Sequence, residues 1–154
     1  MNIDLYSNSY NETFLLGESL GKLLKGNELI LLSGNLGAGK TVFSKGIGHA
    51  LGIESREIVS PSYTLMNIYN GTYKFFHIDL YKIGEYITGG IPEIDDNLDT
   101  GIIVVEWGKF ITNHYSNEKN LINVNISCLK TNTLGRKISV STIMDIPIKT
   151  LAIN

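Results

Sequence analysis

The sequence predicts an α/β fold in which a mixed sheet is flanked by helices and carries antiparallel additions. Two short apolar runs, 28–33 and 101–106, are almost uninterrupted, which is typical of strands buried on both faces of a sheet. Segments with a helical period of apolar residues lie on either side of the first run. Two later segments, 121–129 and 137–141, alternate apolar and polar residues as half-exposed strands do.

Length and composition predict one globular domain over residues 1–154. Hydrophobic residues make up 43% and charged residues 18% of the chain, which is a globular composition. The formal net charge of -2 provides no strongly basic surface, so binding of RNA or DNA by this chain alone is disfavoured. Cys128 is the only cysteine, which excludes an internal disulfide and a cysteine-based zinc cluster.

No segment of the sequence predicts a membrane contact. The apolar runs are all much shorter than the ~20 residues that are needed to cross a bilayer. The first residues have no basic stretch followed by an apolar one, as a secretory signal would have. We therefore expect a cytoplasmic protein.

The first helix is expected over residues 9–25. Ser9 and Glu12 have the spacing of a capping box, in which the two side chains bond free backbone N–H groups at the start of a helix. Leucines then follow on one helical face, and the Gly26-Asn27 pair ends the pattern. These leucines are Leu16, Leu20, Leu23 and Leu24.

A strand, a tight loop and a second helix come next. The apolar run 28–33 is expected to be the strand, and a glycine-rich loop over 34–39 follows it. From Lys40 the pattern is helical again, and Gly52 is expected to end this helix.

The middle of the chain predicts a β-hairpin. Residues 63–69 and 72–79 are rich in strand-forming residues, and the Asn70-Gly71 pair between them is a strong signal for a tight turn. A connection over 84–98, rich in glycine and acidic residues and with at most about one helical turn, leads to the strand at 101–106.

The glycine-rich loop predicts a phosphate site. Residues 34–41 read Gly-Asn-Leu-Gly-Ala-Gly-Lys-Thr and fit the pattern G-x-x-x-x-G-K-[ST], with a strand before and a helix after it. Glycines let backbone N–H groups turn towards phosphate oxygens, and the helix N-terminus adds positive potential. Lys40 can reach the β and γ phosphates, and the Thr41 hydroxyl can ligate Mg²⁺. The residues expected to contact the nucleotide here are Asn35, Leu36, Gly37, Ala38, Gly39, Lys40, Thr41 and Val42.

Two carboxylates are candidates for magnesium binding or for orienting the attacking water. Asp79 and Glu106 each end an apolar strand, and the carboxyl ends of strands form the edge at which α/β proteins bind ligands. The alternative is that each merely ends a strand at the surface. His77 shares a strand face with Asp79, and a structural role is at least as well supported as a functional one. Trp107 either packs near the nucleotide or fills the core.

A second loop is a candidate switch. Residues 60–64 read Ser-Pro-Ser-Tyr-Thr, and their hydroxyl groups could meet the γ phosphate or Mg²⁺. A proline turn that enters a strand is the alternative, and the residues alone favour it. The Asn-Lys-x-Asp signature of guanine binding is absent, which favours ATP over GTP.

Four motifs in this order resemble those of the TsaE (YjeE) family, the small bacterial ATPases of tRNA threonylcarbamoyladenosine biosynthesis. They are the loop 34–41, Ser-Pro-Ser-Tyr-Thr-Leu at 60–65, His-Ile-Asp-Leu-Tyr-Lys at 77–82 and Val-Glu-Trp at 105–107. The resemblance covers roughly residues 9–143. It implies a P-loop NTPase-like fold with a short mixed sheet between helices, and ATP and Mg²⁺ as ligands.

The resemblance also implies roles for individual residues. Lys40 would hold the phosphates, Thr41 and Glu106 would ligate Mg²⁺, and Asp79 would be needed for hydrolysis. The switch would comprise Ser60, Ser62 and Thr64. Further nucleotide contacts would come from Thr13, Lys109 and Arg136.

The family resemblance implies two protein partners. TsaE-like proteins act with TsaB and TsaD, which transfer the threonylcarbamoyl group to tRNA, and their ATP cycle is thought to reset that complex. Contact with tRNA would be indirect, in agreement with the net charge of -2. The chain departs from the family pattern at Ser62, Lys82 and Gly108 and in the short connection 84–98. The change in the 84–98 connection bears on partner binding more than on ATP chemistry.

Two other functions are compatible with a phosphate loop. One is a small-molecule kinase, although Arg56 and Arg136 are the only arginines and an arginine-rich lid is lacking. The other is a binding module whose contact with a partner is controlled by nucleotide binding, without essential hydrolysis.

Overall fold

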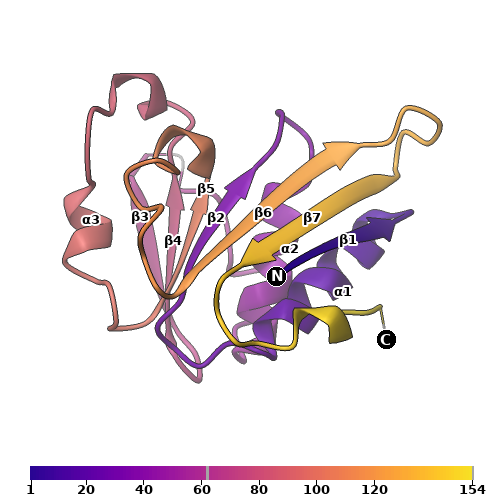
Figure 1. Cartoon of the computed structure of the whole chain (residues 1–154), viewed down its shortest axis with the longest axis horizontal. Coiled ribbons are helices and arrows are strands. Elements are labelled where there is room, and N and C mark those ends of the chain that lie inside the picture. The colour runs from indigo at the N-terminus through magenta and orange to yellow at the C-terminus, as the bar shows by residue number, and fades with distance from the viewer. Residues whose placement is uncertain (62, 154) are drawn as a thin grey trace.

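A mixed seven-stranded sheet in the order β1-β7-β6-β2-β5-β4-β3 forms the frame of this computed structural model, which describes residues 1–61 and 63–153 (Figure 1). Strands β6, β2, β5 and β4 run parallel to one another, and β7, β1 and β3 are antiparallel to their neighbours. The predicted fold class is thereby confirmed. The strands are β1 (Asn2–Ser7), β2 (Leu29–Ser33), β3 (Met66–Asn70), β4 (Lys74–Asp79), β5 (Ile102–Glu106), β6 (Leu121–Cys128) and β7 (Arg136–Thr142).

Two helices, α1 (Tyr10–Gly21) and α2 (Lys40–Ala50), pack together on one face of the sheet. Their backbones come very close, because a Cβ atom at Gly17 would collide with the carbonyl of Phe43, and one at Gly46 with that of Phe14. Only glycine fits at these two positions. This close packing fixes α2, which follows the glycine-rich loop, against the body of α1.

The opposite face of the central strands is covered by the connections between strands. These contain the short helix α3 (Pro92–Asp95) and the 3₁₀ turns Gly84–Tyr86 and Gly108–Phe110. A third such turn, Ile148–Thr150, follows β7. Tyr115 anchors the α3 segment, since its hydroxyl donates to Asp95 Oδ1 at 2.8 Å and accepts from the Ile91 N–H at 2.9 Å.

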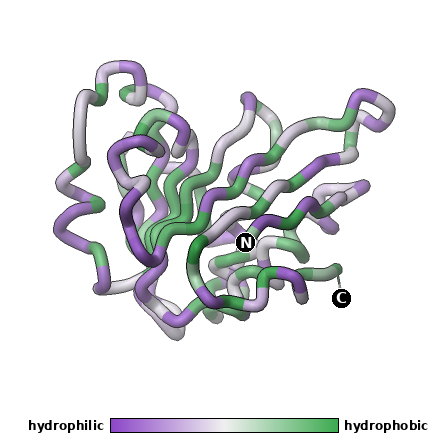
Figure 2. Tube along the Cα trace, in the orientation of Figure 1, coloured by the Kyte–Doolittle hydropathy of each residue, from purple (hydrophilic) through white to green (hydrophobic). Residues whose placement is uncertain are grey.

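Burial explains why the apolar runs predict the centre of the sheet. Strands β2 and β5 are buried on both faces, and Figure 2 shows hydrophobic residues gathered along the central strands. Strands β6 and β7 alternate, with one face in the core and the other bearing Asn125 and Ser139. In the described part of the chain, no helix has both the length and the apolar character that crossing a membrane requires.

The first helix ends earlier than the leucine pattern predicts. It stops at Gly21, and Leu23 and Leu24 donate to carbonyls only three residues back. Beyond that point the buried carboxylate of Glu28 accepts the N–H groups of residues 25–27 at 2.7–3.1 Å. A side chain that satisfies these donors replaces the last turn of the helix.

The hairpin forms, but its turn differs from the prediction. Asn70 still pairs with Lys74, so the loop comprises residues 71–73. Gly71 has no positive φ; a Cβ atom there would collide with the carbonyl of Leu51. That carbonyl accepts the Thr72 N–H at 2.7 Å, and this long-range contact sets the shape of the turn.

Candidate functional site

A cleft of about 320 Å³ lies where β2, β4 and β5 end. The glycine-rich loop joins β2 to α2 at this edge, and the ends of β4 and β5 bring Asp79 and Glu106 side by side in register. Both acids thus lie at the edge where the sequence places them, and their roles stay predictions. The cleft is lined by Tyr10, Leu36, Gly37, Gly39, Lys40, Thr41, Val42, Ser60, Asp79, Tyr81, Glu106 and Trp107.

The loop backbone is tightly folded at two glycines. Gly37 and Gly39 have φ values of 76° and 110°, which residues with a Cβ atom rarely adopt. Gly39 is also the N-cap of α2 and supplies no side-chain cap. Among the described residues, no side chain at the N-cap bonds the first N–H groups of α2, and a helix end of this kind could accept an anion.

Lys40 is held in the cleft by its own loop. Its Nζ donates to the carbonyls of Gly34 at 2.7 Å and Asn35 at 2.9 Å, and lies 4.1 Å from the ring centroid of Trp107. Burial lowers the pKa of the ammonium, and the nearby carboxylates of Glu106 and Asp79 oppose that shift. A phosphate would offer this buried cation a full negative charge in place of neutral carbonyls.

Glu106 is the centre of a buried hydrogen-bond network. Its Oε2 accepts from the Thr41 hydroxyl at 3.0 Å, and Thr41 Oγ1 lies 3.1 Å from Ser60 Oγ. Its Oε1 lies 2.8 Å from His77 Nε2 and accepts from Ser44 Oγ at 3.4 Å. The side chain has little solvent contact, with 2% of the residue exposed. One hydroxyl and one carboxylate side by side are hard oxygen donors of the kind Mg²⁺ prefers, with water and phosphate completing its shell.

Asp79 is only partly buried and faces the same cleft. One carboxylate oxygen, Oδ1, accepts the Tyr81 N–H at 2.9 Å. Burial raises the pKa of this carboxyl; the Tyr81 N–H and the Ser60 side chain oppose the rise, whereas the Glu106 charge adds to it. Such a group is suited to accept a proton or a hydrogen bond from an attacking water.

The two residues whose roles the sequence left open both lie at the site. His77 is fully buried, and its Nδ1 has no hydrogen-bond partner among residues 1–61 and 63–153. Trp107 has a left-handed backbone, with φ 62°, and the ammonium groups of Lys40 and Lys109 both lie over its ring. The ring also contacts Tyr81, with 5.0 Å between centroids.

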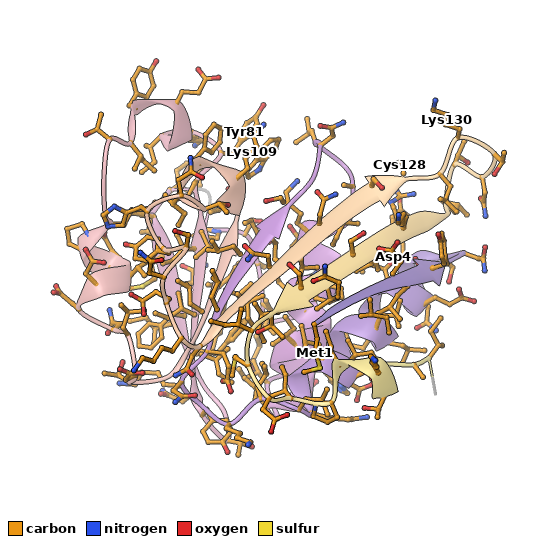
Figure 3. All side chains as sticks on the ribbon, in the orientation of Figure 1. Met1, Asp4, Tyr81, Lys109, Cys128 and Lys130 are labelled. Carbon is orange, nitrogen blue, oxygen red and sulfur yellow. The ribbon has the colours of Figure 1, made fainter. Side chains whose placement is uncertain are left out.

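Most of the predicted loop residues line the cleft, but Asn35 and Ala38 do not. These two line a separate hollow beside Cys128, on the β6 side of the loop. Lys109 lies at the rim, 5.3 Å above the Trp107 ring, and Figure 3 shows it near Tyr81 at the same edge of the molecule.

Thr13 and Arg136 are buried behind the loop. The Thr13 hydroxyl lies 2.8 Å from Ser7 Oγ and 3.2 Å from the Ser9 carbonyl oxygen, and its methyl group faces Gly39. Arg136 donates to the carbonyl oxygens of Ala38 and Gly37. Direct contacts of Thr13, Lys109 and Arg136 with a nucleotide stay predictions.

The candidate switch is divided between two hollows. Ser60 lines the cleft and lies beside Thr41. Thr64 lines a neighbouring hollow of about 260 Å³ and lies 3.3 Å from Asn67 Oδ1. This second hollow shares Asp79 and Tyr81 with the cleft. Ser62 lies outside the described residues.

Three residues of the site were not singled out from the sequence. Ser44 follows Lys40 by one helical turn, so helical spacing from the loop could have indicated it. Tyr81 follows Asp79 by two residues and sits at the mouth of the cleft. Tyr10 reaches the cleft from the start of α1, and no local pattern marks it.

Comparison with known proteins identifies one family. The model of the family described as "Threonylcarbamoyl adenosine biosynthesis protein TsaE" matches residues 7–138. The tRNA threonylcarbamoyladenosine biosynthesis protein TsaE of Treponema pallidum is 37% identical over 106 residues, which are 67% of this chain and 76% of that protein. Its counterpart in Aquifex aeolicus is 40% identical over 101 residues, covering 64% and 71% of the two chains.

A solved structure matches the fold. The crystal structure of Bacillus subtilis YdiB superposes with a TM-score of 0.71 at 22% sequence identity. The match covers 94% of this chain and 88% of that one. At this level of identity, the likeness shows a shared architecture.

Proposed function

Because this chain belongs to the TsaE family of threonylcarbamoyl adenosine biosynthesis proteins, we propose that it is a Mg²⁺-dependent ATPase that acts as an accessory subunit in forming this tRNA modification. One observation carries the proposal: Lys40, Thr41, Asp79 and Glu106 meet in a single cleft at an uncapped helix N-terminus. Positioning and charge stabilisation are the main requirements of phosphoryl transfer.

In this proposal, each residue of the cleft has a role that follows from its chemistry. Lys40 exchanges two carbonyl oxygens for the β and γ phosphates, while the N–H groups at the start of α2 hold the chain of phosphates. Thr41 and Glu106 hold Mg²⁺, which neutralises phosphate charge. Asp79 orients the attacking water at the open side of the cleft.

The proposed partners are the TsaB and TsaD subunits, with tRNA contacted only through them. Two features support an incomplete site that a partner completes. No arginine is among the described residues that line the cleft, so the free protein lacks an arginine finger there. Leu36 and Tyr81, at the mouth of the cleft, are 73% and 55% exposed and offer apolar surface to another protein. Because tRNA modification is the proposed role, we propose a cytoplasmic location.

The test is ATP hydrolysis by the purified protein, alone and with TsaB and TsaD from the same source. Slow hydrolysis that the pair stimulates, and that Lys40→Ala removes, is the expected result. Turnover that ignores the pair would contradict the accessory role. Equal turnover in Lys40→Ala would contradict the assigned site.

A nucleotide-gated binding module is the second candidate, because Ser60 links the loop 60–64 directly to Thr41. In that case nucleotide orders the loop and docks the partner, with hydrolysis incidental. Pull-down of the partner with ATP, with ADP and without nucleotide distinguishes this gated module from the accessory ATPase. Partner capture that is equal in all three states would exclude gating. A small-molecule kinase is disfavoured by the same lack of a cleft arginine.

A further inference from the structure

We infer that Arg136 is a positioning residue that holds the phosphate loop in its binding shape from behind; this inference rests on the proposed nucleotide site. Arg136 is the first residue of β7, where it pairs with Ser7 of β1 and Cys128 of β6. It is 98 residues from Ala38 in the chain. Only 4% of the residue is exposed, so its guanidinium is committed to protein contacts.

The guanidinium connects two loops. Towards the phosphate loop, its Nε donates to the Ala38 carbonyl at 2.7 Å and its Nη2 to the Gly37 carbonyl at 3.3 Å. Towards the β6–β7 hairpin, its Nη1 donates to the carbonyls of Thr133 at 2.8 Å and Gly135 at 2.9 Å. A planar fork with several fixed donors can hold such an arrangement, and a lysine cannot.

These hydrogen bonds fix the orientation of the peptide between Ala38 and Gly39, which faces the proposed ligand. In a trans peptide the C=O and the following N–H point in opposite directions. The Ala38 carbonyl points to Arg136, so the Gly39 N–H points away from it, and Gly39 lines the cleft whereas Ala38 is buried. Arg136 thereby keeps a phosphate-binding N–H turned to the cleft, in a loop whose glycines would otherwise allow other shapes.

The charge of Arg136 supports the same role. Within residues 1–61 and 63–153, it forms no ion pair with a carboxylate. All four of its acceptors are neutral carbonyl oxygens. A buried cation of this kind makes the potential beneath the loop more positive.

The experiment measures MgADP binding by calorimetry for wild type, Arg136→Lys and Glu28→Gln. The lysine variant keeps the charge and loses the fork, and should bind MgADP about tenfold more weakly, as the loss of one charge-assisted hydrogen bond predicts. Its KM for ATP should rise by more than its kcat falls. Glu28 is the matched control, because it is a buried charge that holds backbone N–H groups at the start of β2, at the other end of the strand from the phosphate loop. Its variant should lower Tm and leave MgADP affinity unchanged.

Binding of MgADP by Arg136→Lys within about twofold of wild type would overturn the inference. Failure of the wild type to bind MgADP would instead overturn the proposed function. NMR of the wild-type protein keeps the inference testable if the variant does not fold. Arg56 is exposed and is the only other arginine, so it serves as the internal control. The Arg136 Nε–H should exchange slowly with water, with and without ADP, and exchange as rapid as that of Arg56 would contradict its hydrogen bond to the loop.

Discussion

At the scale of single residues, the two oxygens of Glu106 have separate tasks. Oε2 faces the Thr41 hydroxyl, where we propose the metal, and Oε1 faces His77 on the buried side. An ionised carboxylate accepts only, so the His77 nitrogen that faces it must be the donor. His77 is therefore placed to fix the orientation of Glu106, as residues that bond to metal ligands do.

Replacing His77 should weaken Mg²⁺ binding more than nucleotide binding. His77→Phe removes the donor to Glu106, and we expect the Mg²⁺ concentration for half-maximal hydrolysis to rise about 10-fold or more. His77→Gln keeps an N–H donor and should recover part of the loss. ADP affinity measured in EDTA is the control. A Mg²⁺ dependence that does not change in His77→Phe would contradict this role.

We expect the ionisation of Asp79 to set the pH at which the rate of hydrolysis falls on the acidic side. Burial raises the pKa of its carboxyl above the usual range of an aspartate, so hydrolysis that needs the carboxylate should fall at a higher pH than an ordinary aspartate would give. The sign for stability is opposite: the raised pKa favours the protonated folded state, and this contribution is lost as the pH rises through the folded pKa. Rates measured from neutral to acidic pH should lose this acidic fall in Asp79→Asn, with low activity throughout. An unchanged fall in that variant would assign it to another group.

At the scale of elements, the contact between α1 and α2 depends on glycine. Helix α2 begins at the proposed phosphate loop and packs along α1, where Gly17 and Gly46 let the two backbones meet. Glycine is a poor helix former, by about 1 kcal/mol relative to alanine, so its presence inside both helices has a packing reason. The site therefore depends on helix packing as well as on its own side chains.

Adding one methyl group at this contact should destabilise the protein. Gly46→Ala would drive a Cβ atom against the Phe14 carbonyl and within 2.7 Å of the Glu18 nitrogen. We expect a loss of about 1–3 kcal/mol in the free energy of unfolding, in spite of the better helix propensity. Urea denaturation measures it. Gly89→Ala is the matched control, because a Cβ atom there has no neighbour within 4 Å and should change stability by less than about 0.5 kcal/mol.

At the scale of the whole molecule, local patterns predicted the centre of the sheet and the position of the two acids at its edge. The apolar runs are β2 and β5, and the phosphate loop lies between β2 and α2. Long-range contacts decided the rest. Nothing near Arg136 indicates that it reaches Ala38. Strand β1 was not predicted, because the alternation around Ile3 and Leu5 is too short to indicate a strand by itself. The segment is a strand because it pairs with β7.

Nucleotide should stabilise the entire fold, since the loop it binds contacts α1, β6 and β7. A ligand present at about 100 times its Kd adds roughly 2.7 kcal/mol. For a chain of this length, we expect ADP to raise Tm by about 5–10 °C in a thermal melt. Lys40→Ala should lose most of this shift. A wild-type Tm that does not respond to ADP would contradict nucleotide binding.

The strand order has a consequence for synthesis on the ribosome. Strand β2, which leads into the phosphate loop, lies between β5 and β6, and β1 pairs with β7, with Asn2 opposite Ser141. Strand β1 and strand β2 can therefore gain their sheet partners only after β5, β6 and β7 have been translated. A nascent chain that stops before β6 cannot close the sheet around the loop. Nucleotide can thus assist folding only after β6 has left the exit tunnel.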